Sequence, residues 1–455
     1  MLFPLTSLCV IACIAWAYRR DGGRSPLVLA LSAWALSLFL ALPIFFKYSV
    51  AYSVQTDAFA AACLSAVSLV YLFFRWEPRV APSTYVHRAQ EIRIAIVLGV
   101  AGAFGCLLLL ADAHAHNGLQ FSISYLVDNL SNIRADSRYR LAFGDNRGFL
   151  GTVGGLIAPC AVLCVLAAVK LGREAGRAVR LLGAINLALV AAVSFMVFAG
   201  RATFVNLVLI ALISVFVGGR RLSFRPRTVV VGVLLVTGAW FLSTALIGTR
   251  EKDPSVNGIL TDTMRAELRP WLAGVADSNK SVGLASVSVA YFSATMPTLH
   301  FYTQNKAVPG PFYGAYSFPL PARLVGTING TWDREQWYDT REKIYAPITS
   351  RGYFGNVWAT WLRDLIVDFG YFGAIIFCGV FGAFLAWARN RYELTGALHY
   401  HYLTVIPCFT FGFGAFTSFV FDSFVSIAFF VALAIMVIVR VRFSVAPRSR
   451  VATAG

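Results

Sequence analysis

Long apolar segments alternate with shorter polar ones from one end of the chain to the other. The apolar segments are roughly 17–22 residues long, the length that a helix needs to cross a hydrocarbon core of about 30 Å. This pattern predicts an all-α, polytopic integral membrane protein with about 11 transmembrane helices. The predicted spans lie near residues 2–18, 26–46, 54–74, 94–111, 148–168, 181–200, 203–218, 228–247, 370–388, 400–421 and 423–439.

The polar segments on one predicted side of the membrane carry much more positive charge than those on the other side. Six of them, taken alternately, hold 21 Lys/Arg and 5 Asp/Glu, whereas the rest of the chain holds 18 Lys/Arg and 17 Asp/Glu. Short basic loops stay on the cytoplasmic side of a membrane, so the N-terminus is expected outside and the C-terminus inside. The basic segments are 19–25, 75–93, 169–180, 219–227, 389–399 and the tail from 440.

The composition agrees with a membrane protein and argues against a nucleic-acid partner. Hydrophobic residues make up 58% of the chain and charged residues 13%, and the mean hydropathy is +0.67. A net charge of +17 could suit a nucleic acid, but the basic residues are scattered over six loops as topology determinants. Arg19 and Arg20 follow the first apolar run, which favours an uncleaved first helix over a signal peptide.

The predicted topology divides the chain into three parts. Residues 1–247 form the first eight helices, with an outer segment at 112–147 that contains an amphipathic stretch. Residues 248–355 form one large extracytoplasmic loop, and residues 356–455 form the last three helices and the basic tail. The dominance of a single outer loop places the function on the outer face.

Two segments on the outer side are predicted to be helical without crossing the membrane. Residues 119–142 alternate apolar and charged positions, which is typical of a helix lying on the membrane surface. Residues 281–302 are moderately apolar, but counting them as a twelfth span would put the later basic segments outside. We therefore expect this second segment to form helices that pack at the outer surface or dip partly into the membrane.

Arg201 is the first candidate for chemistry. It is the sole charged residue between Arg180 and Arg220, and an ionisable group inside such an apolar run is a functional candidate. The neighbouring Gly200 would let a ligand approach the backbone. The alternative is a tight outer turn whose arginine reaches the lipid headgroups.

Further arginines and aromatic rings are concentrated in the outer loop. Arginine forks match phosphate oxygens in bidentate fashion, so arginines above a membrane suit a lipid-linked pyrophosphate; surface ion pairing is the alternative. Tyrosine and tryptophan rings suit sugar faces and membrane interfaces equally. The candidate substrate-binding residues are Arg250, Arg265, Arg269, Arg351, Tyr291 and Asn356.

A pair of carboxylates lies where the outer loop enters the ninth predicted span. Asp364 and Asp368 are four residues apart on one helix face, and Arg363 is adjacent. Carboxylates at this boundary could act as a general base or bind sugar hydroxyls. The alternative is an ion pair at a helix terminus beside a glycine-lined turn.

Signals for metals, nucleotides and disulfides are weak. The sequence has no HExxH motif, no paired CxxC and no P-loop, and all eight cysteines lie in apolar spans. The inner loops are too short to build a nucleotide-binding domain. We therefore expect no cofactor and a glycosyl donor that is lipid-linked and reached from outside.

Residues 180–390 resemble the Wzy-type oligosaccharide repeat-unit polymerases, or O-antigen polymerases, of bacterial inner membranes. The order and topology of four segments carry this resemblance more than any one match. The segments are GRAT at 200–203, YFSATMP at 291–297, GAYSFPLPARLVG at 314–326 and GNVWAT…DFGYFG at 355–373.

The resemblance implies a GT-C-like membrane glycosyltransferase that acts on the periplasmic face. Such enzymes transfer a growing glycan from undecaprenyl pyrophosphate to another lipid-linked repeat unit, without a metal. Arg201 matches the arginine at the outer end of their central hairpin, and Arg250, Arg265 and Arg269 compete for the second arginine. The expected partners are undecaprenyl-pyrophosphate-linked oligosaccharide, membrane lipids and a chain-length regulator protein.

Two other functions remain open at this stage. The related O-antigen ligases carry a His-Asn pair before a similar turn, whereas Gly355 precedes Asn356 here, which argues against a ligase and leaves the general base unassigned. A transporter or flippase would move a lipid-linked sugar without chemistry. The absence of a visible internal repeat argues against a transporter.

Overall fold

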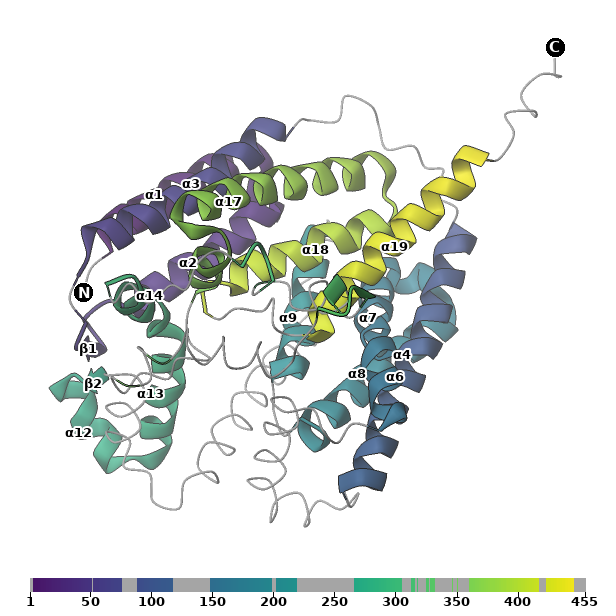
Figure 1. The fold of residues 1–455 in the computed structure, drawn as a ribbon, viewed down its shortest axis with the longest axis horizontal. Coiled ribbons are helices and arrows are strands. Elements are labelled where there is room, and N and C mark those ends of the chain that lie inside the picture. The colour runs from purple at the N-terminus through teal and green to yellow at the C-terminus, as the bar shows by residue number, and fades with distance from the viewer. Residues whose placement is uncertain are drawn as a thin grey trace.

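The computed structural model shows a mostly helical protein (Figure 1). Five of its described helices are long and apolar enough to cross a membrane, and three shorter ones are apolar as well. The prediction of a helical membrane protein is therefore confirmed at this level. The structure describes residues 3–50, 52–75, 88–117, 148–198, 202–218, 266–304, 312–315, 317, 325–326, 328–331, 346, 350, 360–416 and 423–445.

The described helices follow the apolar segments of the sequence closely. They are α1 (Pro4–Asp21), α2 (Pro26–Leu40), α3 (Val54–Phe74), α4 (Arg88–Asn117), α6 (Phe149–Ile157), α7 (Cys160–Leu171), α8 (Gly176–Met196), α9 (Ala202–Val217), α12 (Pro270–Ser278), α13 (Lys280–Ser293), α14 (Thr295–Gln304), α17 (Trp361–Thr395), α18 (Leu398–Phe413) and α19 (Ser423–Val445), with two 3₁₀ turns at Gly22–Arg24 and Gly172–Ala175 and two strands, β1 (Phe46–Tyr48) and β2 (Ala266–Leu268).

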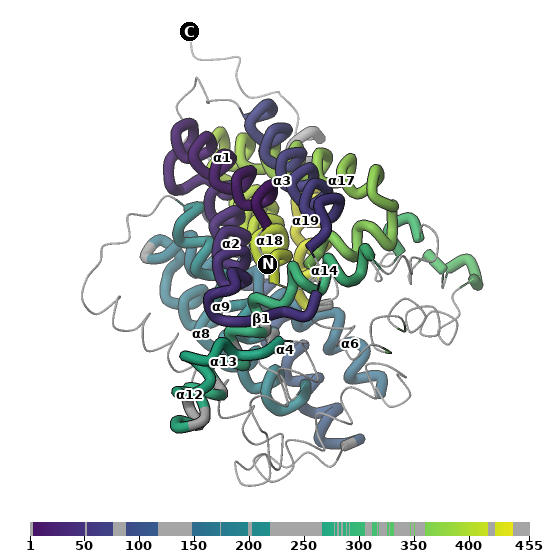
Figure 2. Tube along the Cα trace, turned by 90° about the vertical axis from the view of Figure 1, so that its left-hand side faces the viewer, coloured from purple at the N-terminus to yellow at the C-terminus, as the bar shows by residue number. Residues whose placement is uncertain are grey.

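Two apolar cores hold the helices together, and α18 contributes to both. One core joins α1, α2, α3 and α17, and the other joins α4, α7, α8, α9 and α19. Both views place α1, α3 and α17 in the upper part of the molecule and α4, α6 and α8 in the lower part (Figures 1 and 2). The helices α3 and α17 approach closely because Gly382 faces the carbonyl of Val67, where a Cβ would lie 2.3 Å from the oxygen.

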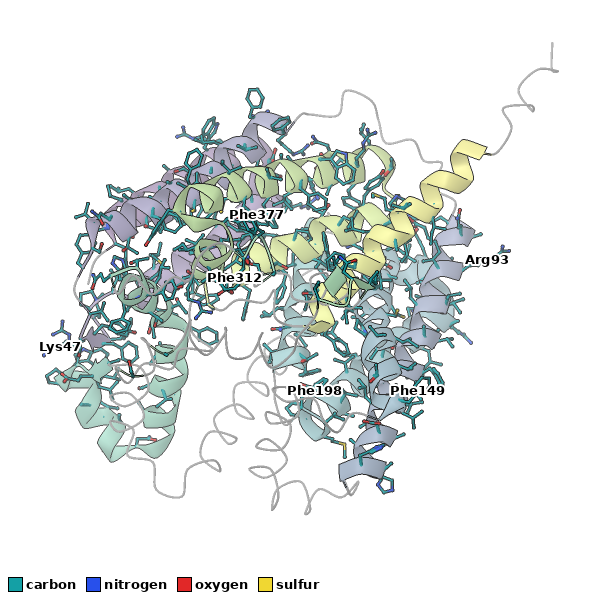
Figure 3. All side chains as sticks on the ribbon, viewed as in Figure 1. Lys47, Arg93, Phe149, Phe198, Phe312 and Phe377 are labelled. Carbon is teal, nitrogen blue, oxygen red and sulfur yellow. The ribbon has the colours of Figure 1, made fainter. Side chains whose placement is uncertain are left out.

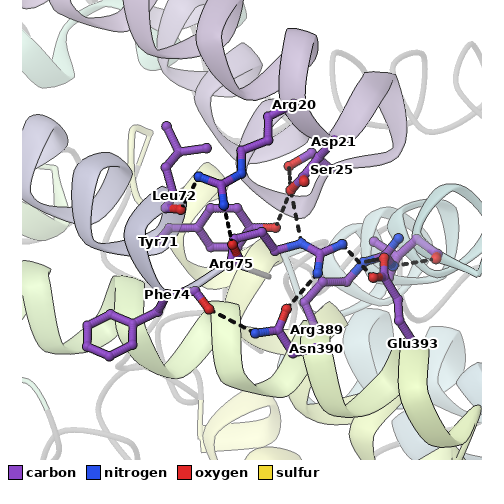
Figure 4. A network of polar contacts seen from close by, with 11 residues as sticks. Arg20, Asp21, Ser25, Tyr71, Leu72, Phe74, Arg75, Arg389, Asn390 and Glu393 are labelled. Carbon is purple, nitrogen blue, oxygen red and sulfur yellow. Dashed lines mark hydrogen bonds and ion pairs between the residues drawn. The ribbon is translucent and has the colours of Figure 1, made fainter. Parts of the chain in front are cut away.

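One end of the bundle is tied together by buried charges, and we call it the Arg75 end (Figure 4). The Arg75 guanidinium follows α3 and contacts Asp21 at the end of α1 (3.2 Å), as well as Asn390 and Glu393 near the end of α17. Arg389 of α17 donates to the carbonyl of Val217 at the end of α9 (2.8 Å). Four helices therefore finish at the same end.

Two more helices join this end through Lys170. Its ammonium lies at the end of α7, 3.3 Å from Glu91 in the first turn of α4, and it also donates to the carbonyl of Gly396. Glu91 accepts a hydrogen bond from the backbone of Leu398, where α18 begins. The ends brought together are those that the charge pattern assigns to one side of the membrane.

The large loop between α9 and α17 contains short helices and a strand. β2 pairs antiparallel with β1, with Phe46 opposite Leu268, and a small apolar core joins this ribbon to α12 and α13. Residues 281–302 form the helices α13 and α14 instead of one continuous span. This outcome agrees with the prediction of packed helices and with leaving the segment out of the spans.

Some predicted boundaries differ from those in the structure. α17 begins at Trp361, nine residues before the predicted ninth span, because the segment around both aspartates is already helical. A break at Gly370, with φ of +68°, separates this first part from the rest of α17. The fifth span is divided into α6 and α7 around Pro159. The predicted span 228–247 and the amphipathic stretch 119–142 lie outside the described residues.

Candidate functional site

The candidate carboxylates lie in the first turns of α17, which are fixed to the end of α18. The backbone N–H of Trp361 donates to the carbonyl of Gly414 (2.8 Å), so the helix starts at a defined place. The Arg363 guanidinium then binds one oxygen of Asp364 through both Nε (3.0 Å) and Nη2 (2.8 Å). Both side chains are buried, so this is a desolvated ion pair that orients the Asp364 carboxylate.

Asp368 connects α17 to the outer loop. Its buried carboxylate accepts a hydrogen bond from the backbone N–H of Ser317, and its carbonyl accepts one from Tyr313 (2.9 Å). The ring of Phe312 packs against the core beside the start of α17 (Figure 3). Asp368 therefore fastens the segment that begins the GAYSFP motif onto the helix.

The break at Gly370 explains why these contacts are possible. A helical carbonyl normally accepts a bond from the residue four positions later, but α17 is non-helical at Gly370. The carbonyls of Val367 and Asp368 accept instead from Phe312 and Tyr313. The glycine of the DFG sequence thus frees backbone acceptors that bind the loop.

Arg269 lies at the base of the outer loop. Its Nε donates to the carbonyl of Pro43 (2.8 Å) and its backbone N–H to that of Phe45 (3.1 Å), while Trp271 of α12 donates to Ile44 (3.1 Å). Arg269 is half-buried between the β ribbon and α12. It holds the loop against the segment that follows α2, and only part of its guanidinium is used in doing so.

The structure brings Asp364 and Asp368 together and leaves most of the other candidates undetermined. Tyr291 lies in the last turn of α13. The remaining candidates, Arg201, Arg250, Arg265, Arg351 and Asn356, lie outside the described residues.

Described contacts join the end of α8 to the start of α9, on the two sides of Arg201 in the sequence. The rings of Phe195 and Phe204 lie 6.0 Å apart, and the backbone N–H of Phe204 donates to the Ser194 hydroxyl (3.4 Å). α8 and α9 therefore form a tight hairpin on either side of Arg201. Hydropathy predicted this hairpin, because the two spans are separated by only a few residues.

One polar cluster was missed by the sequence reasoning. Asp57, in the first turn of α3, accepts hydrogen bonds from the backbone N–H groups of Leu5 and Thr6 (3.0 Å each) and so caps α1. Nearby, Nδ1 of the buried His300 accepts from the backbone of Ser53 (3.2 Å), and burial lowers the pKa of His300 to about 4. Ser53 as N-cap could have marked the start of α3, but no local signal links it to α1 or α14.

The comparisons add no family to this description. No protein-family model matches the chain, and neither the curated proteins nor the solved structures include a significant match. Among the described residues, no group of three or more His, Cys, Asp or Glu side chains could hold a metal ion. The structure therefore defines a mostly helical protein with helices long and apolar enough to cross a membrane.

Proposed function

We propose that this protein is a polymerase of lipid-linked oligosaccharides in the bacterial inner membrane. In this proposal, eleven helices of a GT-C-like fold carry the large loop on the periplasmic face. The enzyme transfers the glycan of one undecaprenyl-pyrophosphate-linked repeat unit to a second one. The proposal is carried by Arg201, which the sequence puts between α8 and α9, because the helix ends that flank it are opposite to those at the Arg75 end.

The polar contacts of the bundle support the proposed sidedness. The helix ends assigned to the cytoplasm by the basic loops are those joined through Arg75, Arg389 and Lys170. The outer loop packs at the other ends, where Thr295 of α14 contacts Ser37 of α2 (3.2 Å). Arg201 would then lie at the level of the periplasmic headgroups, where a lipid pyrophosphate also lies.

The transfer consists of one substitution at an anomeric carbon. An acceptor hydroxyl attacks that carbon, the bond to the pyrophosphate oxygen breaks, and the pyrophosphate leaves on its lipid. Arg201, with a second arginine from the loop, neutralises the charge that builds on the leaving group. The two lipid anchors restrict both substrates to the membrane plane and so favour their encounter.

The two carboxylates have a supporting role in this proposal. Asp364 is paired with Arg363, and Asp368 binds the backbone of Ser317. Both are buried, and Asp368 holds the loop residues Tyr313 and Ser317 at the start of α17. Sugar-binding residues of the GAYSFP motif would be positioned in this way.

The deciding experiment is chain elongation by the purified protein. One synthetic undecaprenyl-pyrophosphate-linked repeat unit is supplied in liposomes, and products are separated by gel and mass spectrometry. A ladder of whole repeat units, with release of undecaprenyl pyrophosphate, is expected, and it should persist in EDTA because the sequence lacks metal-binding motifs. The absence of any ladder with correctly folded protein would refute the proposal.

The same assay separates the two alternative functions. A ligase would transfer the glycan only when lipid A core or an acceptor protein is added, and it would form a single product. A flippase would move the lipid-linked unit between leaflets without forming a glycosidic bond. Each outcome replaces the proposed polymerase with a defined activity.

A further inference from the structure

A carboxylate–imidazole pair lies near the end of α4, away from the carboxylates of α17. Asp112 and His116 are one helical turn apart, and Nδ1 of His116 lies 3.4 Å from Oδ1 of Asp112 and 3.3 Å from the Asp112 carbonyl. Asp112 is buried, whereas the His116 side chain is 46% exposed. The Nδ1–H tautomer fits these two facing acceptor oxygens and would leave Nε2 as the proton acceptor.

Two glycines at the start of the facing helix α6 lie in close contact with this pair. A Cβ at Gly151 would lie 2.2 Å from Oδ2 of Asp112, and one at Gly148 would lie 2.4 Å from Cε1 of His116. Any larger residue at either position would displace the pair or push α6 away. Gly148 is also the N-cap of α6, so the Asp112 carboxylate lies at the N-terminal end of that helix.

Within the described residues, the helices packed against the pair place no lysine or arginine at this end, beside the Asp112 carboxylate. Residues 148–157 of α6 read GFLGTVGGLI, and the outer half of α8 from Asn186 to Phe198 has no titratable side chain. In α7 the titratable groups are Cys160, Cys164 and, at the Arg75 end, Lys170. The other titratable group on α4 here is His114, two residues from each member of the pair. His116 is therefore the side chain that these helices place beside the Asp112 carboxylate.

The pair lies at the same level as the α8–α9 turn. α4 and α8 run in the same direction, because Gly99 faces Leu182 and Gly102 faces Asn186. Met196, the last residue of α8, is ten residues beyond Asn186, as Asp112 is beyond Gly102, so the end of α8 is level with Asp112. Phe198 and Phe149, the first residue of α6, both lie toward the lower end of the molecule in Figure 3.

We infer that His116, oriented by Asp112, accepts the proton of the attacking sugar hydroxyl. This inference rests on the proposed polymerase function and supplies the general base that sequence reasoning left unassigned. The acceptor oxygen forms the new bond to the anomeric carbon, and its proton moves to Nε2 of His116. The bond to pyrophosphate breaks, the charge leaves with the lipid pyrophosphate, and the imidazolium then releases its proton to water.

The test combines three variants with a pH profile of chain elongation. His116→Gln should lower the elongation rate about 100-fold or more, the usual contribution of a general base. It should also abolish the fall in rate at acidic pH that a protonated His116 causes in the wild type. Asp112→Asn should lower the rate, because the ring loses the carboxylate that orients it. His114→Gln, on the same helix turn, is the matched control and should retain both rate and limb.

The outcomes distinguish this inference from the proposed function. If the wild type elongates chains and His116→Gln keeps the rate and the acidic limb, the pair is a structural contact and the inference is wrong. The same conclusion follows if the variants lower only the amount of folded protein, while activity per folded molecule is unchanged. If the wild type forms no ladder at all, the polymerase function itself has failed.

Discussion

The Arg75 guanidinium lies 3.2 Å from the Asp21 carboxylate, and both side chains are more than nine-tenths buried. The same guanidinium reaches Asn390 and Glu393, so one residue links α1, α3 and α17. Removing one partner of such a cluster leaves the remaining charges desolvated and unpaired. Arg75 therefore stabilises the contact between these three helices, although in the sequence it is one of many basic loop residues.

Arg75→Met should destabilise the protein by about 3 kcal/mol, the cost of breaking a buried ion pair. The measurement is the apparent melting temperature in detergent, together with the folded yield. Arg24→Met, which removes an exposed basic residue of the neighbouring loop, is the control and should melt like the wild type. Equal melting temperatures for the two variants would contradict the structural role of Arg75.

The contact between α3 and α17 gives a second, purely steric prediction. A Cβ at Gly382 would lie 2.3 Å from the Val67 carbonyl oxygen, whereas one at Gly379 would make an ordinary 3.6 Å contact with Val70. Gly382→Ala should therefore cost about 1–3 kcal/mol through overpacking. Gly379→Ala should be neutral or slightly stabilising, because alanine favours the helix. Thermal melting of both variants measures the difference, which vanishes if the helices are not in contact.

His300 predicts a pH dependence of stability. Burial lowers the pKa of His300 in the folded protein to about 4, below its ordinary value of 6.5. As the pH falls through this window the unfolded chain takes up the proton first, so stability is full above about pH 6.5 and declines toward pH 4. The expected loss by pH 5 is about 2 kcal/mol.

The variant His300→Asn isolates this contribution. Asparagine offers an oxygen to the Ser53 backbone but does not titrate, so its melting temperature should depend less on pH between 7 and 5. His114→Asn, at an exposed position on α4, serves as the control and should keep the wild-type dependence. Parallel curves for wild type and His300→Asn would show that His300 is not the group responsible.

Local patterns predicted the helices well and their mutual contacts poorly. Hydropathy predicted both ends of α3 correctly, because an apolar span of the right length ends just before Arg75. It placed the start of α17 too late. The two charged residues Arg363 and Asp364 lower the local hydropathy, and the sequence does not show that they pair with each other in a buried position. The pairing of Phe46 with Leu268 joins segments more than 200 residues apart, and no periodicity reports such a contact.

The candidate site was predictable only in part for the same reason. The spacing of Asp364 and Asp368 predicted a shared helix face, and both do lie in the first turns of α17. Their partners could not be predicted, because Ser317 reaches Asp368 through a backbone N–H that carries no side-chain signal. The Asp112–His116 pair was not predicted, because its enclosure by Gly148 and Gly151 depends on tertiary packing.

The sidedness of the chain can be tested by cysteine labelling. Val256→Cys, in the large loop, should react with a membrane-impermeant thiol reagent in spheroplasts, whereas Ser223→Cys, in a basic loop, should not. The background is low because seven native cysteines are buried and Cys9 is half-buried. Labelling of Ser223→Cys but not of Val256→Cys would invert the topology and remove the basis of the proposed function.

Arg201 provides the most direct test of the proposed chemistry. If its guanidinium grips the lipid pyrophosphate, Arg201→Ala loses a charge-assisted contact of about 1.5–3 kcal/mol in the ground state. It loses more in the transition state, where charge builds on the leaving group, so the elongation rate should fall roughly 100-fold or further. Arg201→Lys should rescue poorly, because an ammonium keeps the charge but not the planar fork.

The measurement for Arg201 is the length of the glycan ladder, normalised to the amount of protein in the membrane. A residue that merely closes the α8–α9 turn would behave differently: alanine would reduce folding, and lysine, which also reaches the headgroups, would act like the wild type. Full ladders from Arg201→Lys, or from Arg201→Ala, would therefore make Arg201 a turn residue. The pyrophosphate site would then have to be sought among Arg250, Arg265, Arg269 and Arg351. Arg269 comes first among them, because its described contacts, to Pro43 and Phe45, use only its Nε and its backbone N–H.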